Sequence, residues 1–308
     1  MHRNQLKRGV ERVLVRSGIA STLARLMKGR VLVLAYHNIL PRGLVPLGDR
    51  SLHLSLDAFR DQLDALAARC EIVPLQAILG VTTSGERPRV AITFDDAYRG
   101  AVTSGVEELA ARGLPATIFV APALLGDQTF WWDEAGAGCD GGLGDILRDG
   151  ALWGCRGEAT SVRSWLQQRG VSLRPDVLPA PARSADLGEL LGAVRRHPGL
   201  TVGAHSWSHA NLAALDESAL NVQLKAPLDW MVAHFPGATA PWLAYPYGLE
   251  SPAVQHMARE AGYVGGLLVS GGWVKPGTGS PFVMPRLNVA SGMSAEGLVL
   301  RLTGVLRR

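Results

Sequence analysis

After residue 30, short runs of apolar and β-branched residues alternate with longer segments whose apolar positions repeat with a helical period. The short runs fit strands at Val31–Tyr36, Glu71–Leu75, Arg89–Phe94, Pro115–Val120, Leu200–Ala204, Thr239–Ala244, Tyr263–Ser270 and Phe282–Val289. The longer segments fit helices at Leu56–Arg69, Ala101–Arg112, Asp216–Phe235, Pro252–Gly262 and, closing the barrel, Ser294–Leu306. Strands that alternate with helices form parallel βαβ units. The pattern therefore predicts an α/β fold, a distorted (β/α) barrel of about seven or eight strands.

A long interval between the fourth and fifth predicted strands interrupts this alternation. Residues 124–198 have a glycine-rich centre, a proline-rich stretch and no strand pattern. Such a length without a strand is typical of a functional insertion. We therefore expect a barrel over residues 31–308 that carries an insertion at 124–198, preceded by a basic amphipathic helix over residues 1–30.

Composition excludes several classes of protein. The chain has 308 residues, of which 47% are hydrophobic and 19% charged, which is unlike a disordered chain or a small disulfide-stapled domain. It has no run of about 18 apolar residues, so no spanning helix is expected. Cys70, Cys139 and Cys155 are an odd number and are not spaced as a zinc or redox pair. These features predict a cytoplasmic protein with free thiols.

The net charge of +4 is unevenly distributed. Residues 1–30 hold eight Lys and Arg against Glu11, which makes this segment +7 and leaves −3 for the remainder. Two interpretations stay open for the segment: a solvated helix packed on the domain, or a helix peripheral on the inner face of an anionic membrane. Nucleic-acid binding is not expected, because no basic stripe interleaved with aromatic residues follows.

Polar residues follow four of the predicted strands directly. They are His37, the pair Asp95 and Asp96, the segment His205–His209 and the segment Tyr245–Gly248. In a parallel barrel the carboxyl ends of the strands open on one face, where active sites lie. The four clusters are therefore expected to converge.

Two of these clusters together predict a metal site. His205 and His209 are spaced i, i+4, so both imidazoles lie on one side of a helical turn. Two imidazoles and one carboxylate make a three-ligand site for a divalent ion with open positions. From spacing alone, either Asp95 or Asp96 is the ligand and the other is a free base. An isolated His pair of this spacing is typical of a helix surface, and the adjacent carboxylates favour the metal site.

The motifs resemble those of the polysaccharide deacetylases of carbohydrate esterase family 4, which share the nodulation-type chitooligosaccharide deacetylase homology domain. Thr93–Asp96 resembles their first motif, His205–Leu212 matches the second at each defined position, and Tyr245–Gly248 resembles the third. The resemblance covers about residues 31–290 without the insertion. It implies that Asp95 is the general base, that Asp96, His205 and His209 bind zinc or a similar ion, and that the backbone N–H of Tyr247 stabilises the oxyanion.

Two departures from the family pattern point to substitute residues. Ala244 stands where the third motif usually has an arginine that contacts the base, and Arg286 is a candidate to replace it or else an ordinary salt-bridge residue. No Leu-His-Asp run, the usual source of the catalytic acid, follows residue 260. Tyr36-His37-Asn38-Ile39 resembles the Tyr-His-x-Ile motif of the exopolysaccharide-modifying branch, which implies that His37 is the acid. The alternative is a buried structural histidine.

The resemblance implies a metal-dependent hydrolase that removes acetyl groups from N-acetylated sugars, with O-acetylated sugars left open. The expected partner is a glycan or a lipid-linked sugar precursor. Five aromatic residues are candidate sugar contacts: Trp131, Trp132, Trp207, Tyr247 and Trp273. The tryptophan pair of the insertion fits equally a small core of its own.

Two other functions are compatible with parts of the pattern. A non-haem iron oxygenase also uses two histidines and one carboxylate. A catalytically silent carbohydrate-binding relative would keep the fold. Retention of Asp95 beside all three candidate ligands argues against both, because neither function requires a base there.

Overall fold

A computed structural model describes residues 11, 13–15, 23, 27–80 and 87–304 of the chain. The amphipathic helix expected over residues 1–30 lies largely outside these residues. Six parallel strands form the centre of the fold in the spatial order β1-β5-β6-β7-β8-β9. Their bounds are β1 Val31–Tyr36, β5 Arg89–Phe94, β6 Ala116–Val120, β7 Leu200–Ala204, β8 Thr239–Ala244 and β9 Gly265–Leu267. Three two-residue strands complete the sheet: β4 Glu71–Ile72, β10 Trp273–Val274 and β11 Leu287–Asn288.

The segment after β9 connects the two edges of this sheet. Met284 forms a parallel bridge to Leu267 in β9, and Leu287 in β11 pairs with Leu34 in β1. The chain therefore passes from the last strand back to the first, and the sheet curls. The fold is the expected distorted (β/α) barrel, and the strand region predicted at 282–289 is the piece that joins its edges.

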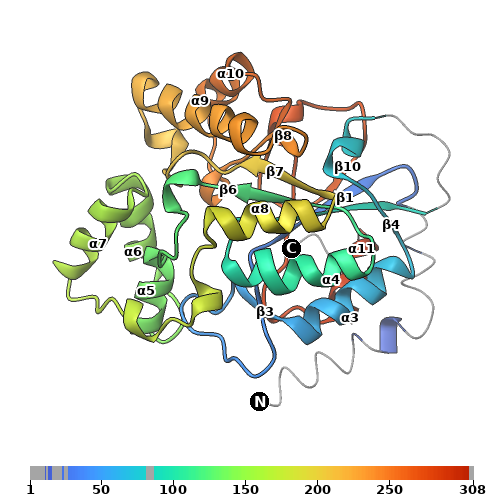
Figure 1. Cartoon of the computed structure of the whole chain (residues 1–308), viewed down its shortest axis with the longest axis horizontal. Coiled ribbons are helices and arrows are strands. Elements are labelled where there is room, and N and C mark those ends of the chain that lie inside the picture. The colour runs from blue at the N-terminus through green and yellow to red at the C-terminus, as the bar shows by residue number, and fades with distance from the viewer. Residues whose placement is uncertain (1–10, 12, 16–22, 24–26, 81–86, 305–308) are drawn as a thin grey trace.

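Helices cover the outside of the sheet (Figure 1). They are α3 Leu56–Ala67, α4 Val106–Ala111, α8 Leu187–Arg196, α9 Glu217–His234, α10 Pro252–Ala261 and α11 Ala295–Leu302. In α3 the Oγ of Ser55 accepts a hydrogen bond from the Ala58 N–H and caps the first turn. Phe59, Leu63 and Leu66 follow at helical spacing and are fully buried, so the amphipathic pattern alone places this helix on the barrel.

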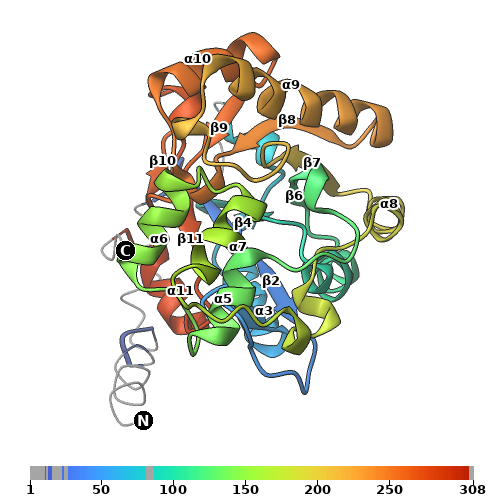
Figure 2. The ribbon, with the colours of Figure 1, turned by 90° about the vertical axis from the view of Figure 1, so that its left-hand side faces the viewer.

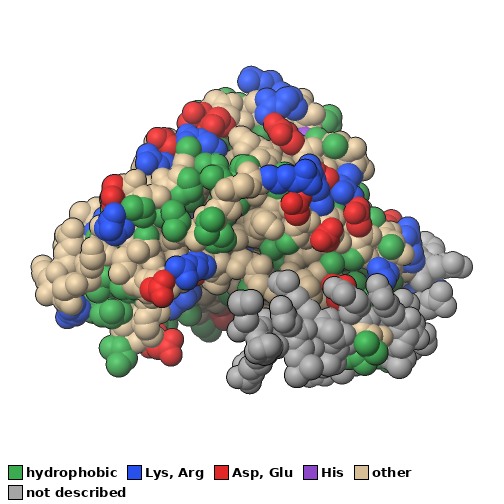
Figure 3. Space-filling model, turned by 90° about the horizontal axis from the view of Figure 1, so that it is seen from below, with side chains coloured by type: hydrophobic (Ala, Val, Ile, Leu, Met, Phe, Trp, Pro, Cys, Tyr) green, Lys and Arg blue, Asp and Glu red, His purple; other side chains and the backbone are tan. Residues whose placement is uncertain are grey.

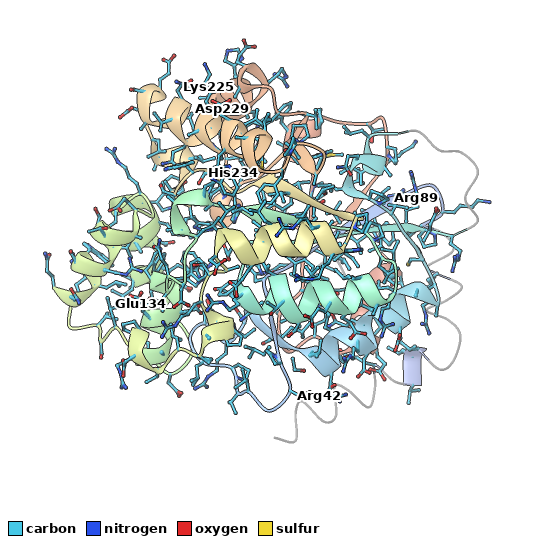
Figure 4. The ribbon with its side chains drawn as sticks, in the orientation of Figure 1. Arg42, Arg89, Glu134, Lys225, Asp229 and His234 are labelled. Atoms are coloured by element: carbon cyan, nitrogen blue, oxygen red, sulfur yellow. The ribbon has the colours of Figure 1, made fainter. Side chains whose placement is uncertain are left out.

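The insertion is helical and covers the carboxyl ends of the strands. Between β6 and β7 it contains α5 Trp131–Gly138, α6 Asp145–Asp149 and α7 Ala159–Gln167, followed by α8. Figure 2 shows α5, α6 and α7 in front of the barrel. In Figure 4, Arg89 at the start of β5 and Glu134 in α5 lie on opposite sides of the molecule. The strand therefore runs toward the insertion.

The structure differs from the sequence pattern at several strands. The run predicted at Glu71–Leu75 forms only the two residues of β4, because Pro74 has no N–H to donate and a 3-10 turn, Leu75–Ile78, begins after it. The run at Tyr263–Ser270 keeps only the three residues of β9. Two short strands, β2 Asn38–Leu40 and β3 His53–Ser55, form a separate sheet that the pattern did not indicate.

Three further features concern the helices, the cysteines and the surface charge of the described residues. Within the described part of the chain, no helix is long and apolar enough to cross a membrane. Cys70, Cys139 and Cys155 are all free thiols. Seen from below (Figure 3), acidic and basic side chains are interspersed, and the described residues of this face form no continuous field of one sign.

Candidate active site

Four polar clusters meet in one pocket at the carboxyl ends of the strands. Its volume is about 190 Å³. His37 follows β1, Asp95 and Asp96 follow β5, and His205 follows β7 in its wall. The insertion supplies a further side of the pocket through Trp131, Trp132, Leu143, Arg148 and Leu152. The convergence that the strand ends predict is therefore present.

Asp96, His205 and His209 form a compact cluster of three buried side chains. One ligand atom from each lies within 4.8 Å of the others. The Oδ1 of Asp96 is 3.1 Å from the Nε2 of His209 and 3.5 Å from the Nε2 of His205. Asp96 and His209 have φ angles of 69° and 60°, a region that is costly for residues with a side chain. Such strain is found at functional sites, where the surrounding structure enforces it.

The hydrogen bonds around this cluster fit a divalent ion. The Nδ1 of His205 lies 2.7 Å from the carbonyl oxygen of Ala244, so it donates there and leaves the Nε2 lone pair facing Asp96. Burial, opposed by the two aspartates, lowers the pKa of His205 to about 4, which favours the neutral form that binds metals. Among the described residues, the buried Oδ1 of Asp96 accepts no hydrogen bond. A cation at this point would satisfy it, so the residues present fit a metal.

Asp95 is held by Arg286 from the segment that joins the barrel edges. Two hydrogen bonds of 2.7 Å link the guanidinium to both carboxylate oxygens. The same guanidinium also donates to the Oγ1 of Thr93 and, through Nε, to the carbonyl of Leu268. Burial by itself would raise the pKa of Asp95, but Arg286 and, to a lesser degree, His205 hold that pKa well below its ordinary value. The carboxylate is therefore ionised, and the contact expected of an arginine at position 244 is made from position 286.

His37 and Tyr247 complete the polar lining of the pocket. His37 is half-buried, and its Nδ1 is buried without a hydrogen-bond partner among the described residues. A structural histidine satisfied by internal hydrogen bonds would use that atom. Tyr247 has a φ of 61°, and its ring meets the ring of His209 edge-on with centroids 4.6 Å apart. The ring therefore restricts the orientation of one candidate ligand.

The tryptophan pair of the insertion is both core and pocket wall. Trp131 and Trp132 are 3% and 9% exposed, yet both line the pocket. The indole of Trp132 lies 4.8 Å from the His209 ring and stacks at the same centroid distance on Phe130. Its Nε1 donates to the hydroxyl of Tyr98. The two interpretations of this pair are therefore compatible.

Trp207 and Trp273, also candidate sugar contacts, do not line this pocket. The Trp207 N–H binds the Oε1 of Gln223 in α9, which anchors its backbone toward the outer helix layer. Trp273 lies in β10 and pairs with Leu32 near the amino end of β1. It is therefore at the end of the barrel away from the strand carboxyl ends.

A buried hydrogen-bond network behind the pocket was not foreseen. Asp133 in α5 is fully buried, and its Oδ2 accepts from the Tyr98 hydroxyl at 2.6 Å. Its Oδ1 lies 2.9 Å from the Nε2 of His53 and accepts from the backbone N–H of Asp49. The only sequence signal was an acidic residue directly after Trp131 and Trp132. The network fastens the insertion to β3, to the loop before it and to the loop after β5.

Comparison with known protein families identifies the family of the chain. The family described as polysaccharide deacetylase matches residues 82–266, which is more than half of the chain. The chain belongs to the polysaccharide deacetylase family. The resemblance inferred from the motifs is thereby confirmed, whereas its placement in the exopolysaccharide-modifying branch stays a prediction.

Solved structures show the same fold at low sequence identity. The deacetylase PplD of Streptococcus pyogenes, in complex with acetate, is 16% identical over 88% of this chain and 96% of its own, with a TM-score of 0.60. IcaB from Ammonifex degensii is 17% identical over 89% of this chain and 97% of its own, with a TM-score of 0.59. A polysaccharide deacetylase from Bacillus cereus is 14% identical over 89% of this chain and 69% of its own, with a TM-score of 0.62. No curated protein matches the chain.

Proposed function

We propose that the protein is a metal-dependent hydrolase that removes acetyl groups from N-acetylated sugars of a glycan or a lipid-linked glycan precursor. Membership of the polysaccharide deacetylase family supports deacetylation of a carbohydrate. The observation that carries the metal-dependent mechanism is the pairing, in one pocket, of an ionised Asp95 on Arg286 with the Asp96, His205 and His209 cluster.

The three clustered side chains would hold the ion, with zinc the first candidate for a site of two imidazoles and one carboxylate. When bound, the ion supplies a Lewis acid for the acetyl carbonyl and lowers the pKa of a water molecule. The neutral form of His205 and the buried Oδ1 of Asp96, which accepts no hydrogen bond from the described residues, would be among its ligands.

Asp95 is the proposed general base. Its carboxylate takes one proton from the attacking water, whose oxygen forms a bond to the acetyl carbon. Arg286 fixes the plane of the carboxylate through both oxygens, which reduces the motion needed for the transfer. The oxyanion that forms lies against the backbone N–H of Tyr247 in this proposal.

His37 is the proposed acid. The bond between the carbonyl carbon and the sugar nitrogen breaks, and the nitrogen takes a proton from the His37 imidazolium. The products are acetate and a free amine. An ester substrate needs this proton less, because an alkoxide leaves more easily than an amide anion, so removal of O-acetyl groups stays within the proposal.

The decisive experiment measures acetate released from N-acetylated and O-acetylated oligosaccharides by the purified protein. We expect release that stops on treatment with a chelator and returns on addition of zinc. Asp95→Asn is the matched variant, because asparagine has the same volume and cannot accept the proton; it should keep the metal and lose most of the turnover. Oxygen consumption without acetate release would indicate the iron oxygenase instead. Binding of oligosaccharides without either reaction would indicate a silent relative.

A further inference from the structure

Arg148 places a positive charge at the mouth of the pocket. It lies in the last turn of α6, in the insertion, and is among the residues that line the pocket. Its side chain is exposed. The charge therefore faces the space that leads to the candidate metal cluster.

Arg148 is an arginine of the insertion that lines the pocket, and four other arginines of the insertion have partners. Arg163 pairs with Glu134, Arg174 with Asp176, and Arg183 with Asp127. Arg169 packs on the Trp165 ring. In the described residues, the side chain of Arg148 forms no ion pair and donates no hydrogen bond to the protein. Its donors are available to a ligand.

The sign of the charge in the pocket wall depends on the metal ion, because the wall also holds Asp49, Asp95 and Asp96. Asp95 is paired with Arg286, and Asp96 faces the two histidines. The Oδ1 of Asp49 accepts from the N–H and the Oγ of Ser51. These hydrogen bonds come from neutral groups and leave Asp49 charged, so Asp49 and Asp96 together exceed Arg148 by one negative charge. A divalent ion at the cluster would change this sum from −1 to +1. With the ion bound, the pocket mouth therefore favours a ligand with negative charge.

We propose that Arg148 binds an anionic group, a carboxylate or a phosphate, that the substrate carries near its acetylated sugar. The planar fork of the guanidinium matches both groups with two parallel hydrogen bonds. The inference rests on the proposed function and specifies its substrate class: an acidic glycan or a sugar with a phosphate linkage. A neutral chitin-like oligomer would leave Arg148 without a partner.

The test compares three N-acetylated compounds of different charge. Tri-N-acetylchitotriose is neutral, a hyaluronan oligosaccharide carries carboxylates, and UDP-N-acetylglucosamine carries phosphates. Binding is measured by calorimetry in the His37→Ala background, which should slow turnover and leaves the pair of Asp95 and Arg286 intact. We expect at least one anionic compound to bind more tightly than the neutral one, and the two anionic compounds distinguish the carboxylate from the phosphate.

Arg148→Gln should then weaken binding of the preferred anionic compound about 10- to 100-fold and leave the neutral compound within about twofold. The preference should also shrink as ionic strength rises, because salt screens an exposed charge. Arg169→Gln is the matched control, since it removes a positive charge of the same insertion outside the pocket wall. It should change none of the three affinities.

Equal affinities of the neutral and anionic compounds would overturn the proposal of an anionic substrate. An equal loss of affinity for all three compounds in Arg148→Gln would also overturn it. The wild-type protein, assayed in parallel for acetate release, distinguishes this failure from that of the proposed function. Acetate release from the neutral oligomer with no effect of Arg148→Gln would remove the present inference alone. Binding of the anionic compound through Arg148 with no acetate release from any acetylated sugar would remove the deacetylase proposal and keep the anion site.

Discussion

Arg286 and Asp95 lie 191 residues apart in the sequence and form two parallel hydrogen bonds in the interior of the barrel. The arginine side chain has no exposed surface, and the carboxylate has almost none. Both charges have therefore lost their hydration, and each depends on the other for compensation. The pair connects the carboxyl end of β5 with the segment that joins β9 to β1.

The pair should show strong energetic coupling. Arg286→Gln leaves a buried carboxylate without its partner, so we expect a loss of about 3–5 kcal/mol in the free energy of unfolding. The double variant with Asp95→Asn should lose clearly less than the two single variants together, because no unpaired charge remains. Urea denaturation of the four proteins measures this. As a control, the exposed pair Arg174 and Asp176 should give additive effects. Additive losses for the buried pair would contradict the interpretation.

The three candidate ligands should be separately necessary for the metal. Asp96→Ala, His205→Ala and His209→Ala each remove one of the three atoms that lie within 4.8 Å of one another. A site with two remaining ligands binds weakly, so we expect each purified variant to lose the ion and its activity. Metal analysis of the proteins measures this. His256→Ala, an exposed histidine of α10, should retain the metal. Full occupancy in all three variants would eliminate the site.

The hydroxyl of Tyr98 should keep the pocket wall in place. It donates to the Oδ2 of Asp133 and accepts from the Nε1 of Trp132, so Tyr98→Phe removes a hydrogen-bond partner from each of these two buried atoms. We expect a loss of about 1–3 kcal/mol in stability, together with a changed tryptophan emission and weaker substrate binding. Tyr263→Phe is the control, because that buried hydroxyl donates to the Leu224 carbonyl and does not line the pocket. It should lower stability without altering substrate binding. Equal kinetics in both variants would count against a positioning role.

The strands and the meeting of the site residues at one end of the barrel could both be predicted from the pattern of apolar runs. β1, β5 and β7 are rich in apolar and β-branched residues, and the reactive residues follow them directly, so the position of these residues in the barrel needs only the rule for parallel strands. The shortening of the strand region after Glu71 required attention to Pro74. Where strands are as short as β10, two residues cannot be distinguished from a loop by pattern.

Contacts that form only when distant parts of the chain come together could not be predicted from local sequence patterns. The role of Arg286 could be suggested only because position 244 is alanine, since its meeting with Asp95 requires the return of the chain from β9 to β1. Arg148 and Asp133 belong to helices of the insertion, whose placement no periodicity determines. Trp273 was a candidate sugar contact by its residue type, but it lies at the end of the barrel away from the pocket.

Glu108 should make the stability depend on pH in the acid range. Its side chain is 12% exposed and accepts hydrogen bonds from Arg60 at 2.6 Å and Arg112 at 2.9 Å. Burial opposes ionisation, but the two arginines hold the pKa of Glu108 below its ordinary value. A lowered pKa in the folded state gives stability that is present above the unfolded pKa and is lost as the pH falls through the folded one. Glu108→Gln should therefore cost about 1–3 kcal/mol at pH 7 and much less near pH 3, measured by urea denaturation. An equal cost at both pH values would exclude the ionic contribution.

His37 has two possible roles: an acid that protonates the leaving amine, or a structural residue at the end of β1. It lies in the pocket with Asp95 and Asp96, and its buried Nδ1 has no partner among the described residues. If it supplies the proton, His37→Ala should slow hydrolysis of an N-acetyl substrate about 10²- to 10⁴-fold. Hydrolysis of an activated acetate ester should fall far less, because its leaving group departs without a proton. The measurement is the ratio of amide to ester turnover in the wild type and the variant, with metal content determined in both. A ratio that stays constant would remove His37 from proton transfer, and a loss of metal in the variant would make it a fourth ligand instead.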